Sequence, residues 1–412
     1  MKKICTIFIA IALILALTAC GDNNASPIGN SALATNTPNT PTDSIAKDPV
    51  TPTSKPADPA TDNETVKDDV AIDEKNFPDE AFRTCVKDFD KDGNGILTFE
   101  ERQIKKIDLL SKNIEDLKGI EYFTSLTALY CAYNKLTALD VSMNTKLVTL
   151  SCSYNQLTSL DVSKNIDLQE MYCDHNQLTN LDCGMNTELS TLCCGYNQLT
   201  NLSVSKNTKL KSLDCYDNQL TSLDVSKNAI LSYLECGSNA LTNLDISMDT
   251  GLKELCCNLN QLASLDVSTN TGLSTLRCEH NQLTSLDVSK NTELQTLDCS
   301  NNKLTSLDVG MNTGLQELYC DYNKLTSLDV SVNTALKRMR CENNQLTSLD
   351  ISKNTALNTL NCSGNQLTSL NVSMNTKLDD LDCRYNKLTS LDISKCSGSI
   401  SVYADSNVVI TK

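Results

Sequence analysis

Oxygen-bearing residues recur through the twelve-residue stretch DKDGNGILTFEE, which begins at Asp90. Their spacing is that of a loop in which carboxylates, amides, a hydroxyl and one backbone carbonyl surround a hard divalent cation. The six candidate ligands are Asp90, Asp92, Asn94, Ile96 (through its carbonyl), Thr98 (through a water) and Glu101. Gly95 supplies the sharp turn. A register that starts at Asp88 fails, because Phe99 would then occupy the closing position. The stretch therefore predicts a metal site.

This loop resembles a single EF-hand, and that family implies Ca²⁺ as the cofactor. Apolar residues at helical spacing flank it, with Phe82, Val86 and Phe89 before and Ile104 and Ile107 after, so we expect a helix on each side. With one copy visible, the expected affinity is weak, on the order of 10⁻⁴–10⁻³ M. The alternative is a loop that keeps these residues but serves only as a helical cap.

A second chemical possibility is a pair of carboxylates, Asp214 and Glu235, at equivalent positions of adjacent repeats. Neighbouring strands would bring them to roughly 5 Å, the separation in a retaining glycosidase. Repeated acids produce such neighbours routinely, however. The chain also has no Trp to stack a sugar and only two His. We therefore expect a protein that is not an enzyme.

The elements that position these residues follow from a strict repeat. Thirteen cysteines recur every 21 residues from Cys131 to Cys383, and an Asn follows each of them three places later. The phrase LVTLSCSYNQL at 147–157 resembles the leucine-rich repeat. That family implies a parallel-β solenoid with an irregular convex side, here preceded by a small helical EF-hand-like cap. A parallel β-helix of another type is the alternative.

Each repeat places Leu150 and Cys152, or their equivalents, on one side of a short strand, where stacked coils bury them. A disulfide between in-register neighbours would strain the ladder, so we expect buried, free thiols; a linear column also offers no tetrahedral metal cage. Cys193 and Cys256 fall one position earlier, where exposure is expected. The recurring Asn is expected to bond backbone groups of adjacent turns.

The chain divides into five parts by composition and period. These are a lipoprotein signal peptide (1–19), a lipidated Cys with a disordered Pro/Thr/Asp-rich tether (20–72), the cap (73–109), the solenoid (110–396) and a terminating coil (397–412). The solenoid is expected to begin with a degenerate first coil, offset by 22 residues and marked by Ile104, Ile107, Leu109, Ile114 and Leu117, before the thirteen 21-residue repeats. Two lysines, a short apolar run and LTAC at 17–20 resemble the lipobox of bacterial lipoproteins. That family implies acylation of Cys20 and attachment to a membrane. An ordinary secretory signal is the alternative.

Binding residues are expected on the concave strand face, interleaved with the inward Leu and Cys. Tyr and Arg are favoured interface residues; here they are Tyr130, Tyr172, Tyr216, Tyr233, Tyr319, Arg277, Arg338 and Arg340. Further rings lie just beyond the strands, including Tyr133, Tyr154, His175 and Tyr196. The formal net charge of -16 argues against nucleic acid as the partner. The alternative is that these residues form an ordinary solvated surface.

The combination of anchor and repeats is broadly similar to the internalin-like surface proteins. That resemblance implies recognition of a protein or glycan on another cell. The 21-residue period and the strand cysteines depart from the usual internalin pattern. The resemblance therefore implies the general class of ligand for this chain, but not which ligand it is. Two other functions stay open: a spacer without a dedicated ligand, and a module whose calcium state controls its stability.

Overall fold

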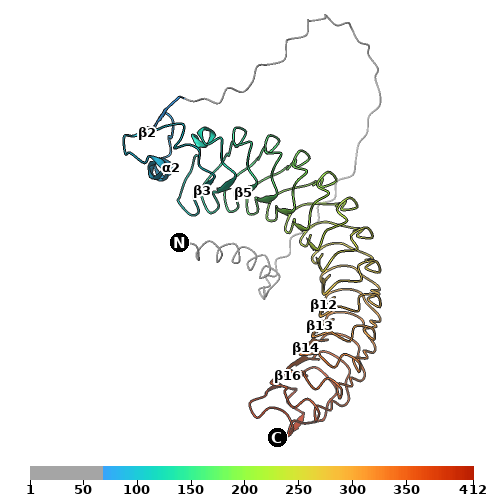
Figure 1. The fold of residues 1–412 in the computed structure, drawn as a ribbon. Coiled ribbons are helices and arrows are strands. Elements are labelled where there is room, and N and C mark those ends of the chain that lie inside the picture. Colours follow the sequence, from blue (N-terminus) through green and yellow to red (C-terminus); the bar gives the residue numbers. More distant parts are fainter. Residues whose placement is uncertain (1–67) are drawn as a thin grey trace, which may run out of the picture. The chain divides into compact units, whose positions relative to one another are not determined.

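The structure is a computed structural model that describes residues 68–412. The predicted signal peptide, Cys20 and most of the tether lie outside the described residues. The part described is a curved solenoid whose strands line the inner side of the curve (Figure 1). This confirms the predicted fold class.

Fifteen three-residue strands form one parallel sheet, in the order β18-β16-β15 and then stepwise back to β3. They are β3 (Lys106–Asp108), β4 (Ala128–Tyr130), β5 (Thr149–Ser151), β6 (Glu170–Tyr172), β7 (Thr191–Cys193), β8 (Ser212–Asp214), β9 (Tyr233–Glu235), β10 (Glu254–Cys256), β11 (Thr275–Arg277), β12 (Thr296–Asp298), β13 (Glu317–Tyr319), β14 (Arg338–Arg340), β15 (Thr359–Asn361), β16 (Asp380–Asp382) and β18 (Ser401–Tyr403). The register pairs equivalent residues of successive repeats, as Leu150 with Met171.

The core is a continuous column of stacked apolar side chains. Leu147, Leu150, Cys152, Leu157 and Val162, with their equivalents in each coil, have essentially no exposure. The thirteen ladder cysteines are all buried and carry free thiols, as expected. Burial raises the pKa of the Cys131 thiol to about 12 and holds those of the other ladder thiols above their ordinary value.

The two off-ladder cysteines of the strands differ from expectation. Cys193 is half-buried, and the predicted exposure of Cys256 is wrong, because its side chain is 1% exposed. In the sheet Cys256 lies between Glu235 and Arg277. A small thiol thus lies between two longer side chains in the register, so burial on this face depends on the neighbouring coils.

The cap packs directly onto the first coil. Helix α2 (Glu80–Val86) begins at the N-cap Asp79, whose carboxylate accepts a hydrogen bond from the Phe82 backbone N–H at 2.8 Å, and continues into η1 (Lys87–Phe89). Phe77 makes edge contacts with Phe82 and with Tyr122, which belongs to η2 (Ile120–Tyr122). The cap thus shares the hydrophobic core of the repeats.

The expected helix after the loop is not formed. A single turn at 99–102 leads into β3, and Ile107 and Leu109 are buried at alternating positions. As a strand beside β4, the segment buries every second side chain and pairs its backbone hydrogen-bonding groups, so it joins the sheet. Strand β3 therefore lies within the range assigned to the cap. Before the loop, β1 (Val70–Ala71) pairs antiparallel with β2 (Ile96–Leu97).

The sheet ends at β18, which carries the 21-residue step onward by pairing Val402 with Leu381. A separate two-stranded sheet forms beside it from β17 (Ser390–Asp392) and β19 (Val409–Thr411). Within it Val409 and Ile410 are exposed.

Two ladders of asparagine hold the coils together, and the sequence predicts only the first. In that ladder, Asn281 donates to the carbonyls of Cys257 and Cys278 at 3.0 and 3.1 Å and accepts from the Leu262 N–H at 2.9 Å. In the second, Asn291 donates to the carbonyls of Val267 and Asn270, both at 2.9 Å. Each ladder therefore joins successive coils with buried hydrogen bonds, and the second is interrupted at one position.

One position of the second ladder carries an acid. Asp249 stands where the other coils have Asn, is completely buried, and has no hydrogen-bond partner for either carboxylate oxygen. The equivalent amide donates to carbonyls in the preceding coil, here those of Val225 and Asn228, so a carboxylate would face acceptors. Burial, then the charges of Asp245 and Asp224, raise the pKa of Asp249 to about 7.

We expect Asp249→Asn to stabilise the chain above neutral pH. The pKa of Asp249 is higher in the folded chain than its ordinary value, so the protonated carboxyl is the form that the folded state tolerates. Its contribution to the free energy of unfolding is fully present below pH about 4 and is lost as the pH rises through about 7. At pH 8 the variant should gain about 1–3 kcal/mol from the restored donors, and at pH 5 less. Thermal unfolding of both chains at the two pH values measures this. Equal gains at both values would show that Asp249 does not titrate. Asp350→Asn, at the exposed position of a distant coil that is equivalent to Asp245, is the control.

Candidate functional site

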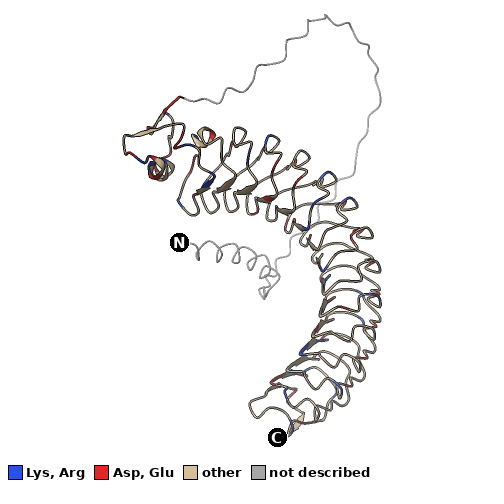
Figure 2. Cartoon of the chain, in the orientation of Figure 1, with Lys and Arg blue, Asp and Glu red and all other residues tan. Residues whose placement is uncertain are grey.

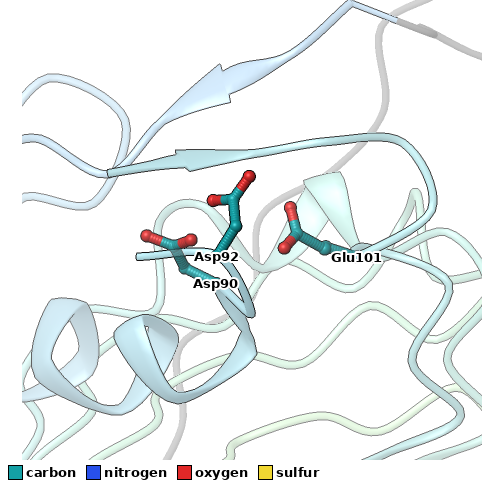
Figure 3. Close-up of side chains that lie close together, drawn as sticks. All are labelled: Asp90, Asp92 and Glu101. Carbon is teal, nitrogen blue, oxygen red and sulfur yellow. The ribbon is translucent and has the colours of Figure 1, made fainter. Parts of the chain in front are cut away.

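The predicted metal loop brings its principal acids together. Asp90, Asp92 and Glu101 each place one carboxylate oxygen within 4.8 Å of the others (Figure 3). Asp90 follows η1, and Glu101 lies in the turn that leads to β3, so the cap helix and the first coil fix the two ends of the loop. Glu101 is 8% exposed, whereas Asp92 is exposed.

Backbone N–H groups hold these carboxylates in place. Asp90 accepts from the N–H groups of Gly93 and Gly95, both at 2.8 Å. The turn at Gly95 has a φ of 80°, the left-handed conformation for which glycine is favoured. Glu101 accepts from the backbone of Thr98 at 2.9 Å and of Lys91 at 2.8 Å. These bonds, that of Thr98 first, lower the pKa of Glu101, so the loop carries this charge at neutral pH.

The remaining candidate ligands line the same loop. Asn94 accepts from the Ile96 N–H at 2.7 Å, and the Thr98 hydroxyl donates to Glu101 at 2.8 Å. Ile96 lies in β2, whose pairing with β1 fixes the backbone at that point. Every candidate ligand atom is an oxygen, and three of the ligands are carboxylates, which is the chemistry a hard cation such as Ca²⁺ prefers. The residues present therefore fit the ion.

The candidate binding residues lie at the first or last position of a strand, or just beyond it, and do not form one cluster. Tyr130, Tyr172, Tyr233 and Tyr319 are half-buried, each next to a buried Leu or Met of its strand. They are spread from β4 to β13, and Tyr216 follows β8. The concave face is thus a long surface with rings at intervals, and a ligand that touches all of them must be extended.

Two of the arginines lie on β14, where Figure 2 shows basic residues on the strand. Arg338 donates to Glu317 at 2.8 Å, and the Tyr319 hydroxyl donates to the same carboxylate at 3.2 Å. Arg340 donates to Glu342 at 3.0 and 3.2 Å. Glu342 is 4% exposed, so its buried carboxylate holds the exposed guanidinium of Arg340 in place.

Two further groups complete this region. Asp321 is 3% exposed and lies 3.8 Å from Arg340, and burial raises its pKa to about 7. Arg277 is half-buried in β11, in register with Asp298 of the next strand. Burial also raises the pKa of Asp298. Acids on this half of the face therefore serve mainly to position the arginines.

The acid pair considered for catalysis has a structural role. Asp214 and Glu235 are in register on β8 and β9. Each accepts a hydrogen bond at 3.0 Å from the backbone N–H two residues later, that of Tyr216 or of Gly237. Glu235 is 4% exposed. These bonds orient both carboxylates along the strand ends.

A stack of rings beyond the strands was not expected from the sequence as a continuous unit. The centroids of Tyr133 and Tyr154 are 4.2 Å apart, those of Tyr154 and His175 3.9 Å, and those of His175 and Tyr196 4.0 Å. Tyr216 extends it at 5.3 Å with a tilt. The sequence does contain a signal for this stack, because an aromatic residue follows each of four successive ladder cysteines by two places.

Within the described residues, no helix has the length and apolar character to cross a membrane.

Comparison with known proteins agrees with the repeat architecture. A family profile described as leucine rich repeats (2 copies) matches residues 292–333. Internalin J of Listeria monocytogenes serotype 4b (strain F2365) is 37% identical over 71 residues, which is 17% of this chain and 8% of that protein. This match therefore spans a small part of the relative's length.

Solved structures match over most of the solenoid. The functional domain of InlJ from Listeria monocytogenes, described as including a cysteine ladder, is 34% identical, with a TM-score of 0.67, over 84% of this chain and 72% of that one. An internalin, InlF, from the same species is 24% identical with a TM-score of 0.68, over 82% and 98% of the two chains. A leucine-rich-repeat protein of Leptospira interrogans is 25% identical with a TM-score of 0.68, over 76% and 86%.

Proposed function

The chain belongs to the internalin-like leucine-rich-repeat family, and from this premise we propose that it is a lipid-anchored cell-surface protein that binds a protein or glycan. The observation that carries the proposal is the row of half-buried tyrosines and positioned arginines along the concave strands. Side chains of these types, held by their surroundings, lose little entropy when a partner binds. A spacer without a ligand is the alternative function.

The anchor part of this proposal rests on the sequence at 17–20. The small residues before Cys20 follow a short apolar run that two lysines precede. Multiple acyl chains on Cys20 would hold the protein at a membrane surface. The Pro-rich stretch up to residue 67 would then separate the repeats from that surface.

The cap adds a proposed calcium site. Asp90, Asp92 and Glu101, with Asn94, the Ile96 carbonyl and Thr98, would hold the ion, which would supply the positive charge that balances three converging carboxylates. The cap shares its core with the first coil, so bound ion would stabilise that end of the solenoid.

We expect the ligand to bind the concave face. The test is a screen of the purified chain against mucins, extracellular-matrix proteins and a glycan array, with and without Ca²⁺. Tyr172→Ala, Tyr233→Ala and Tyr319→Ala together should weaken a true hit at least tenfold. The matched control replaces three exposed residues outside the strands, Met143, Met248 and Met311, by Ala. A hit that both triple variants keep would place the site elsewhere, and no hit at all would favour the spacer.

Calcium is expected to raise the thermal midpoint of the chain. At 10 mM Ca²⁺ a site of the expected affinity contributes roughly 1–3 kcal/mol, and Asp90→Ala or Glu101→Gln should remove the effect because each deletes a charged ligand. Calorimetry in EDTA and in 10 mM CaCl₂, with titration calorimetry of the ion, measures it. Asp88→Asn, beside the loop but outside the ligand set, is the control. Identical melting curves with and without calcium would contradict the site.

The anchor is tested by Cys20→Ser. In cells that express the chain, the wild type should incorporate labelled palmitate and sediment with membranes, because acyl chains on Cys20 would retain it there. The variant should lose both properties. Wild-type protein released into the medium without label would instead support an ordinary secretory signal.

A further inference from the structure

The concave face differs in charge between its two halves. On β4 to β10, none of the described residues at the two outer positions of each strand, or two residues beyond the strand end, is Lys or Arg. Those positions carry small residues together with Tyr130, Tyr172, Tyr216, Tyr233, Glu170, Asp174, Asp214, Glu235 and Glu254. From β11 to β16 the same positions carry Arg277, Arg338, Arg340 and Arg384 together with seven acids. What distinguishes the first half is therefore that its acids and rings have no basic residue among them at these positions.

Tyr172 occupies the middle of this first half. Its register neighbours are Ser151 and Cys193, which are small and leave room on both sides of the ring. Glu170 on the same strand is exposed. Among the described residues no ion pair to Glu170 is formed. A tyrosine beside an accessible carboxylate is a combination that receives a lysine or arginine side chain.

The surrounding acids are held in fixed positions. Asp174 accepts a hydrogen bond from the Ser153 hydroxyl at 2.5 Å and lies 3.0 Å from a ring nitrogen of His175, which is itself part of the aromatic stack. Asp214 is oriented by the backbone N–H of Tyr216. A partner would therefore meet carboxylates that need little reorganisation on binding.

The molecule itself shows how such rings accept cations. At the N-terminal edge of this surface, the Lys106 ammonium lies over the ring of Tyr130, 4.6 Å from its centroid. At the other end of the solenoid, the Arg384 guanidinium lies 5.3 Å from the ring centroid of Tyr403. Two strand tyrosines, Tyr130 and Tyr403, thus already have a basic side chain next to the ring.

We propose that the concave surface of β4–β10, centred on Tyr172 and Glu170, docks a lysine- and arginine-rich segment of a protein partner. This inference rests on the proposed function, and it selects protein over glycan. Sulfated or uronic-acid glycans would meet Glu170, Asp174 and Asp214 with like charge. A neutral glycan would leave these carboxylates without a charged partner.

The test measures fluorescence polarisation of labelled twelve-residue peptides with the whole chain. One probe alternates Lys or Arg with Gly and Ser, and a second has Glu at every basic position. We expect the basic probe to bind and the acidic probe not to bind. Added salt should weaken the complex, because exposed charges are screened.

A charge-matched pair of variants locates the site. Glu170→Gln with Asp174→Asn and Tyr172→Ala should weaken the basic peptide at least tenfold. The control, Asp266→Asn with Asp287→Asn and Tyr322→Ala, removes the same charge and one ring outside the strands and should change binding less than twofold. Should the first variant unfold, the single exposed Glu170→Arg replaces it, with the same expectation.

Equal weakening in both variants would overturn the inference, because it would reflect overall negative charge. Absence of peptide binding would overturn it as well. A ligand from the screen that needs the concave tyrosines but is not displaced by the basic peptide would leave the proposed function intact and refute this partner class. A ligand displaced by the peptide would support both.

Discussion

Stacking in a fixed 21-residue register is the constraint on which the rest of the structure depends. A single coil has only a three-residue strand and a few inward side chains, which is too little to exclude water. The in-register pairing of Leu150 with Met171, and of each equivalent pair, joins these small clusters into one column. Stability is therefore a property of neighbours, as in other solenoids, and the cap at the N-terminal end covers a face that would otherwise be wet.

The same register explains why the concave face is free to vary. Core leucines and cysteines use one side of each strand, and the two asparagine ladders satisfy the backbone where the chain turns. Neither task falls on the outward strand positions. Tyrosine, arginine or serine can then occupy them with little consequence for the fold, and the binding chemistry can change along the solenoid from the half without basic residues to the arginine-bearing half.

Much of this could be predicted from the sequence because the period is strict. The cysteine spacing predicts the strands and the buried thiols, and the residue types in the loop at 90–101 predict the three carboxylates that the structure brings within 4.8 Å. The features that were not predicted all depend on contacts between neighbouring coils. Burial of Cys256 depends on side chains from both adjacent strands. The segment through Ile107 carries both a helical spacing and the apolar pattern of a degenerate repeat, and it becomes a strand because β4 is available to pair with it. Ring stacking beyond the strands likewise needs the geometry of successive turns.

The cysteine ladder makes folding and redox chemistry inseparable. In the native solenoid the ladder thiols are shielded, and their raised pKa leaves almost no thiolate to react. When coils separate, the same sulfur atoms become ordinary thiols, many on one flexible chain and at regular intervals. An oxidant can then join them in wrong pairs, and each such pair prevents the column from reassembling. In an oxidising medium every opening of the coils therefore carries a risk of irreversible loss, so the burial of the thiols protects the protein only while the coils stay stacked.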